Sequence, residues 1–202
     1  MTFYEQLGIV IPGSVFLFGL VLYFPVRQVL MAKDGISVGE LGIFVLLAYA
    51  AGHLIAAVGN ALESVLWRVA GGMPSDWVVN ESATLLSEQQ IEQLRSRIAT
   101  RFNIALPNIR GLDKKTWWPI SRQIYADVAK NGKSDRIDTF NGNYGLNRGL
   151  CAACIALSVI ALVQAHWAVA VGLTVGAIVF GYRTYRFGVH YGRELYMQFL
   201  VL

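Results

Sequence analysis

The sequence predicts an all-α polytopic membrane protein, with four transmembrane helices in two pairs and a helical insert between the pairs. Of its 202 residues, 55% are hydrophobic and only 15% are charged, and the mean hydropathy is +0.47. A soluble domain carries about a quarter charged residues. The charges of this chain are concentrated in its middle, whereas long stretches near both ends have almost none. This distribution is typical of membrane spans that flank an extramembrane region.

The first pair of predicted spans covers residues 7–24 and 41–61, with the turn-like Lys33-Asp34-Gly35 between them. A helix needs about 20 apolar residues to cross the hydrocarbon core. Pro12 lies near the start of the first span, where the amides of the first turn have no helical partner and proline is tolerated. No basic residue precedes this span and no small-residue cleavage site follows it, so we expect a retained span and not a signal peptide.

The second pair covers residues 149–165 and 167–182, and only a short polar stretch that ends at His166 separates the two. We therefore expect a tight helical hairpin, with Trp167 at the membrane interface, where aromatic residues are enriched. The expected division of the chain is a first helix pair, a helical insert, a transmembrane hairpin and an amphipathic tail, at residues 1–62, 63–147, 148–182 and 183–202.

The orientation follows from the basic residues. With four spans, both termini and the insert share one side of the membrane, and that side holds all of the 17 Lys and Arg residues except Arg27 and Lys33. Because positive charge accumulates on the cytoplasmic side, the termini and the insert are predicted to be cytoplasmic, in a bacterial inner membrane. The first span taken alone has its positive charge at the wrong end, so the later spans must set the topology.

The insert has the pattern of three helices. Ser87 and Gln90 are spaced as a capping box at the start of the first helix. The second begins near Trp117, and Ser134 can cap a third that runs into the third span. The apolar positions of the first two helices recur at helical spacing and are Ile91, Leu94, Ile98, Ile120, Ile124 and Val128. No strand alternation competes with this pattern.

Polar residues of the second span share one helical face. They are Tyr49, His53, Asn60 and Glu63. Polar groups at membrane depth are costly and usually face a protein interior, a water-filled cavity or a partner. One hypothesis is a pore lining, a gate or a switch that senses protons, since histidine titrates near neutral pH. The alternative is a hydrogen bond between helices that sets their packing, with Glu63 in the headgroup region.

Small residues predict close helix packing in two spans. Gly52 and Gly59 lie in the second span, and Gly172 and Gly176 form a G-x-x-x-G spacing in the fourth. Such faces let helix backbones approach closely in lipid. The sequence leaves open whether the contacts lie within one chain or between chains, and we expect a homo-oligomer.

Several basic residues are candidate contacts for a cytoplasmic protein partner or for lipid headgroups. They are Arg122, Arg148, Arg183, Arg186, His190 and Arg193. The net charge of +4 and the pI near 9.2 are compatible with nucleic acid. The positive-inside pattern and anionic lipids already explain this charge, so lipids are the favoured partner and direct nucleic-acid binding is disfavoured. The apolar end of the tail indicates a helix that lies at the interface or docks on the insert.

Enzymatic activity has weak support in the sequence. Arg183 and His190 resemble the R-x6-H pattern of HEPN-type ribonucleases, but Thr184 departs from the polar residue usual in that motif. Basic residues that face the headgroups explain the pair as well. Cys151 and Cys154 lack further ligands nearby, so we expect packing residues, no metal and no cofactor. We assign no catalytic residue and favour a non-enzymatic protein.

A few short motifs resemble a group of small bacterial inner-membrane proteins, some of them encoded in anti-phage defence loci. These motifs are Ile11-Pro12-Gly13, Gly52-His53, Gly59-Asn60 and Tyr144-x-x-x-Arg148. The resemblance implies a membrane subunit or effector that works with a cytoplasmic partner. The first functional hypothesis is an oligomer that couples a cytoplasmic signal to a change in the membrane. The alternative is a non-conducting scaffold that anchors and clusters a cytoplasmic effector.

Overall fold

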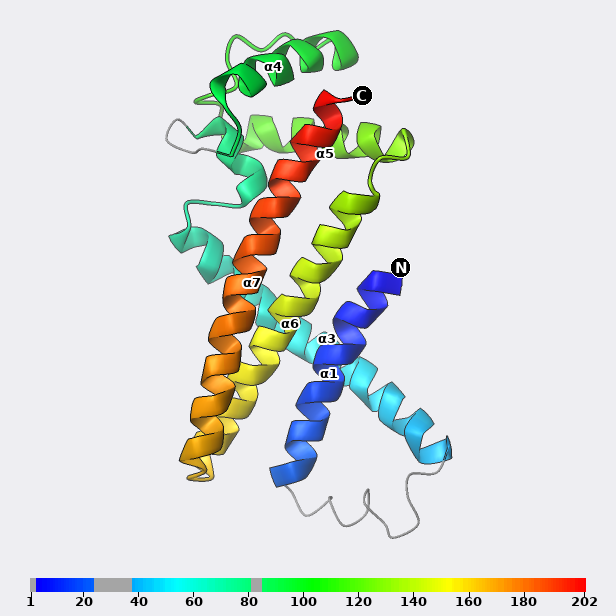
Figure 1. Ribbon diagram of the computed structural model, residues 1–202, viewed down its shortest axis with the longest axis vertical. Helices are drawn as coiled ribbons and strands as arrows, with labels where there is room; N and C mark the ends of the chain where they lie inside the picture. The colour runs from blue at the N-terminus through cyan, green and yellow to red at the C-terminus, as the bar shows by residue number, and fades with distance from the viewer. Residues whose placement is uncertain (1–2, 24–37, 81–84) are drawn as a thin grey trace. The chain divides into compact units, whose positions relative to one another are not determined.

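The computed structural model describes residues 3–23, 38–80 and 85–202, and it contains no strand in these ranges (Figure 1). The prediction of an all-α chain is confirmed for this part of the sequence. The elements in chain order are α1 (Phe3–Tyr23), α3 (Val38–Val69), the 3-10 helix η1 (Pro74–Val79), α4 (Glu88–Phe102), α5 (Lys114–Lys130), α6 (Asp135–Val163) and α7 (Trp167–Leu200).

Within the described residues, α3, α6 and α7 are long and apolar enough to cross a membrane, and Gly8–Leu22 in α1 is a shorter apolar helix. These three helices are longer than the predicted spans. The third helix of the insert continues without a break into the predicted third span, as expected, and the predicted tail is a direct continuation of the predicted fourth span. No proline interrupts either sequence, so the helical hydrogen bonding continues beyond the apolar stretch.

The chain divides into two compact units. Unit 1 comprises Met1–Val65 and Gly142–Tyr185, and unit 2 comprises Leu66–Asn141 and Arg186–Leu202. Residues 186–202 of the predicted tail belong to the same unit as the central region, whereas residues 183–185 belong to unit 1. The helices α3, α6 and α7 each change unit partway along their length.

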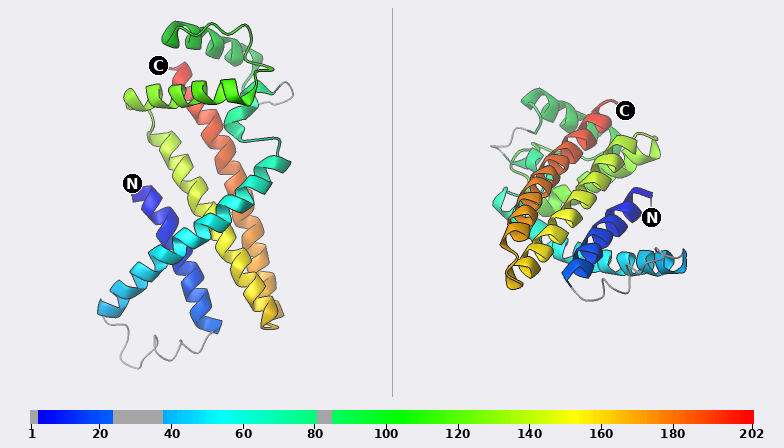
Figure 2. Two further views of the ribbon diagram at one scale, coloured as in Figure 1. Left: turned by 180° about the vertical axis from the view of Figure 1, so that it is seen from behind. Right: turned by 60° about the horizontal axis from the view of Figure 1, so that its bottom comes forward.

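Unit 1 is assembled through small residues. A Cβ atom added to Gly13 of α1 would collide with the backbone of α3 at Ala48 and Gly52, and one added to Gly149 of α6 would lie 2.6 Å from Cγ of Pro12. Figure 1 shows α3 running behind α1 and α6, and the left view of Figure 2, seen from the other side, shows α3 crossing in front of them. The helices α6 and α7 lie side by side in these views. Many large apolar side chains of this unit point outward, as Leu54 does with 70% of its surface exposed, whereas Ile55 and Leu157 are buried.

Unit 2 has a core of large side chains. Trp117, Tyr196 and Phe199 are completely buried there, together with the apolar faces of α4 and α5. The predicted apolar positions of both helices are confirmed as buried. The capping box of Ser87 and Gln90 is also confirmed, because each side chain bonds the backbone amide of the other. Asp113, which the sequence analysis did not single out, caps α5 by accepting from the amides of Lys115 and Thr116.

The tail packs on the central region. Leu195, Tyr196 and Phe199 of α7 lie in the same hydrophobic cluster as α4 and α5. A Cβ atom on Gly192 would lie 3.0 Å from the backbone of Pro74, so the tail also passes close to η1. Of the two alternatives for the tail, the structure therefore shows docking on the central region.

Candidate functional site

Three of the four polar residues predicted on the second span lie on the exposed surface of α3. Tyr49, His53 and Asn60 are exposed within unit 1. The rings of Tyr49 and His53 meet edge to face with centroids 4.7 Å apart. Between residues 41 and 61 the rest of the outward surface of α3 is apolar, with Leu47 55% and Leu54 70% exposed. These three residues, which we call the polar edge of α3, interrupt an otherwise apolar outer surface.

Glu63 is engaged differently from the polar edge. Its carboxylate forms an ion pair with the guanidinium of Arg148 on α6, and both side chains are mostly buried, with 19% and 24% exposed. Arg148 also lies over the ring of Tyr144, 5.7 Å from its centroid. Charge-assisted hydrogen bonds of this kind are shorter and stronger than neutral ones. The pair joins the first predicted helix pair to the second within unit 1.

Gly59 makes room for this ion pair. A Cβ atom added there would lie 3.3 Å from Cγ of Arg148, and one added to Gly52 would collide with the carbonyl of Ile9. Both glycines therefore serve contacts within one chain. In α7, a Cβ atom on Gly176 would lie 3.5 Å from Sγ of Cys154, whereas one on Gly172 would meet nothing within 4 Å.

The remaining basic residues are spread over several environments. Nε of Arg183 donates to Asn147 at 3.1 Å, and the His190 ring stacks on Phe140 with centroids 5.5 Å apart. Arg186 and Arg193 are exposed. The guanidinium carbon of Arg122 lies 6.0 Å from the ring of Trp118. In these contacts Arg183 and His190 have different neighbours.

The sequence analysis missed a buried polar cluster in unit 2. The Tyr196 hydroxyl donates to the carbonyl of Ser75, and Nε1 of Trp117 donates to the Tyr196 hydroxyl at 3.3 Å. Burial raises the pKa of Tyr196, so this hydroxyl stays protonated. Buried tyrosine and tryptophan usually require a polar partner. The occurrence of Trp117 and Tyr196 among apolar residues could have indicated a buried polar cluster. Their partner, the carbonyl of Ser75 on η1, was not predictable from spacing.

A second, partly buried tyrosine hydroxyl lies in the same unit. Tyr125 of α5 donates to the carboxylate of Asp138 at 2.8 Å, which joins α5 to the start of α6. Burial and this hydrogen bond raise the pKa of Tyr125 to about 12. Both act by favouring the protonated hydroxyl, which is the donor that Asp138 requires.

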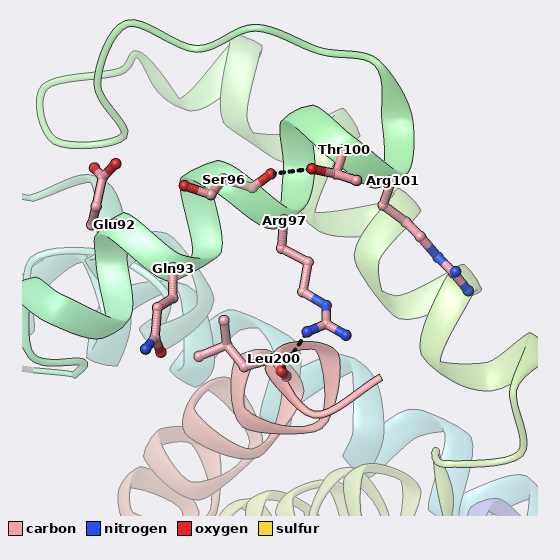
Figure 3. Close-up of a pocket in the computed structure, with 7 residues that line it drawn as sticks. All are labelled: Glu92, Gln93, Ser96, Arg97, Thr100, Arg101 and Leu200. Atoms are coloured by element: carbon pink, nitrogen blue, oxygen red, sulfur yellow. Dashed lines mark hydrogen bonds between the residues drawn. The ribbon is translucent and has the colours of Figure 1, made fainter.

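An open groove of about 660 Å³ lies along α4 in unit 2 (Figure 3). Arg97 points across it and donates to the carbonyl of Leu200 at 2.8 Å, while Arg101 pairs with Asp127. Seven residues line the groove, and they are Glu92, Gln93, Ser96, Arg97, Thr100, Arg101 and Leu200. Most of the lining residues are polar or charged, but the surface that they expose to the groove is largely apolar.

The described residues hold no group of three or more His, Cys, Asp or Glu side chains that could bind a metal ion. Comparison with protein-family models, with curated proteins and with solved structures finds no match to this chain.

Proposed function

We propose that this chain is a four-span protein of the bacterial inner membrane that forms a homo-oligomer and couples a cytoplasmic partner or signal to a change in the membrane. In this proposal α1 crosses the membrane in addition to α3, α6 and α7, which makes four spans. Both termini and unit 2 are cytoplasmic. The resemblance in short motifs supports a role as a membrane effector or subunit of anti-phage defence. No catalytic step is assigned.

The observation that carries the proposal is the polar edge of α3. Tyr49, His53 and Asn60 are exposed on a helix whose other outward side chains, such as Leu54, suit lipid. Leaving polar groups in hydrocarbon is costly, so they usually face a partner or water. In an oligomer with the polar edges of several copies facing one another around an axis, these side chains would contact both a partner and water.

The helices supply a route from unit 2 to the membrane. Parts of α3, α6 and α7 belong to unit 2 and other parts belong to unit 1. A protein bound to unit 2 can therefore act on three helices at once, and a small change in their packing can move the polar edge. Helix shifts of about 1–2 Å are a common switching motion.

Currents across planar bilayers that contain the purified full-length chain test the proposal. We expect a measurable conductance from the parent chain. His53→Ala and Asn60→Ala should reduce it, whereas Leu54→Ala, a neighbouring outward residue, should leave it unchanged. If no current is measured at any pH or voltage, or if the two variants conduct as the parent does, a conducting function is wrong.

The alternative is a non-conducting scaffold, which the groove on α4 supports. Such a scaffold would anchor and cluster a cytoplasmic protein through the polar residues that line the groove. Deleting the tail would be a poor test, because Leu195, Tyr196 and Phe199 are core residues. The double variant Gln93→Glu/Ser96→Glu changes only the surface. Loss of a stoichiometric co-purified protein in this variant, together with the absence of any current, would favour the scaffold.

A further inference from the structure

An exposed indole lies among basic residues on the outer side of α5. Trp118 has 63% of its surface exposed, and the guanidinium of Arg122 lies 6.0 Å from its ring centroid. Lys115, three residues before the indole, is also exposed. Spacings of three and four residues place these side chains on one side of a helix. This side is distinct from the buried stripe that begins with Trp117.

The positive charge of this side is not neutralised by neighbouring carboxylates. Among the described residues, no ion pair joins Lys115, Arg122 or Lys130 to an acidic side chain. Asp127, the acidic residue within α5, pairs with Arg101 of α4. We call Lys115, Trp118, Arg122 and Lys130 the basic side of α5.

We infer that the basic side of α5 binds the anionic phospholipid headgroups of the membrane that the chain spans. Tryptophan is enriched at headgroup level, and the stems of Lys and Arg lie along apolar surface while their charges reach the phosphates. Juxtamembrane basic residues are attracted by the negative surface potential of the cytoplasmic leaflet. This inference rests on the proposed function, in which the spans tether unit 2 to a bilayer and so give the headgroups a high effective concentration.

Single-stranded nucleic acid is the competing polyanion. Proteins that bind it without sequence preference use a basic groove and several aromatic side chains that stack successive bases. Here a single indole lies on the outer surface of one helix, and the groove of unit 2 is lined by other residues on α4. The observations therefore favour the membrane surface.

A fluorophore that senses polarity, attached at Ala126→Cys, tests the inference. Ala126 is exposed and lies one turn after Arg122. The full-length chain, with Cys151→Ala and Cys154→Ala in the background, is placed in nanodiscs of phosphatidylcholine or of an equal mixture with phosphatidylglycerol. We expect a blue shift of the emission in the anionic discs, which high salt reverses. Trp118→Ala and Arg122→Gln should abolish the shift, and Gln123→Ala should retain it.

Two controls keep the result specific. The same fluorophore at Ser96→Cys on α4 should give no shift between the two kinds of disc. The thermal midpoint of Trp118→Ala should match that of the parent chain, because the side chain is exposed. The inference is overturned by equal emission in both discs, or by a shift that survives Trp118→Ala and Arg122→Gln.

A fluorescent single-stranded oligonucleotide, added to the protein in detergent, tests whether the basic side binds nucleic acid instead of lipid. Binding that is lost in Trp118→Ala, without any lipid-dependent shift, would assign the basic side to nucleic acid and overturn the inference. If the lipid response is absent while the currents that depend on His53 persist, only this inference falls. If the protein does not insert into discs at all, the proposed function falls with it.

Discussion

The two units bury opposite kinds of side chain. In unit 1, many large apolar residues face outward and helices meet largely through small ones. Val163 is 80% exposed there, whereas Ala152 is 0% exposed. In unit 2, Trp117 and Phe199 are 0% exposed, and charged residues such as Glu92 and Arg122 are exposed. Water drives large apolar groups inward, but lipid supplies no such force between helices and close packing of small residues takes its place.

The difference appears along a single helix. In α7, Ile178 is 66% exposed within unit 1, whereas Phe199 is 0% exposed within unit 2. Both parts of α7 are helical, so the surroundings and not the secondary structure decide which side chains are buried. The pattern is that of a helix that leaves lipid and enters a domain packed in water.

The largest expected effect comes from the core of unit 2. Trp117→Ala should lower the free energy of unfolding of this unit by about 3–5 kcal/mol, because it leaves a cavity and removes the donor to Tyr196. The adjacent Trp118 is 63% exposed, and Trp118→Ala should change the free energy by less than about 0.5 kcal/mol. Hydrogen exchange of the α4 and α5 amides in detergent measures both. Equal losses in the two variants would contradict the assignment of the core.

Close packing in unit 1 predicts the next effect. Gly52→Ala should lower stability by about 1–3 kcal/mol, because the new Cβ atom meets the carbonyl of Ile9 and the helices must separate. Gly172→Ala is the matched control, since nothing lies within 4 Å of its added Cβ atom. The thermal midpoint in detergent should fall in the first variant alone. A fall in the second as well would indicate a contact between chains at Gly172.

The ion pair of unit 1 should have a moderate effect. Glu63→Gln leaves Arg148 without its carboxylate, and we expect a loss of about 1–3 kcal/mol, less than for a fully buried pair because both side chains are partly exposed. The double variant Glu63→Gln/Arg148→Gln should recover part of the loss. Additive losses in a double-mutant cycle of thermal midpoints would show that the two side chains do not interact.

The smallest effect is expected at the start of α4. Ser87→Ala removes the side chain that accepts from the amide of Gln90 and should destabilise unit 2 by about 1 kcal/mol. Ser96→Ala, an exposed position within the same helix, should be neutral or slightly stabilising, because alanine has the higher helix propensity. Chemical denaturation monitored at the α4 amides compares the two variants, and equal midpoints would argue against the capping role.

The helices of unit 2 were predictable from the sequence because their signals are local. The capping box and the apolar stripes of α4 and α5 depend on residues within two turns of one another. The apolar stretches of α3, α6 and α7 were also evident from composition. Their full lengths were not, because a helix continues beyond its apolar stretch wherever no residue breaks it, as α7 does up to Leu200.

Contacts between segments distant in the sequence were not predictable. Tyr196 bonds to Ser75, and Glu63 pairs with Arg148, across 121 and 85 residues respectively. Spacing along one helix placed Glu63 on the same face as Tyr49, His53 and Asn60. In the structure Glu63 pairs with Arg148 of α6, whereas the other three residues are exposed. The role of His53 and Asn60 remains a prediction, since it depends on what covers the exposed polar edge.

Labelling of single cysteines with a thiol reagent that cannot cross the membrane tests the central claim most directly. The background carries Cys151→Ala and Cys154→Ala. Gln6→Cys reports on the start of α1, Ser96→Cys on unit 2, and Gln164→Cys on the turn between α6 and α7. We expect only Gln164→Cys to react in intact spheroplasts, and all three to react after lysis. Reaction of Ser96→Cys from outside, or opposite behaviour of Gln6→Cys and Ser96→Cys, would contradict a four-span protein with a cytoplasmic unit 2.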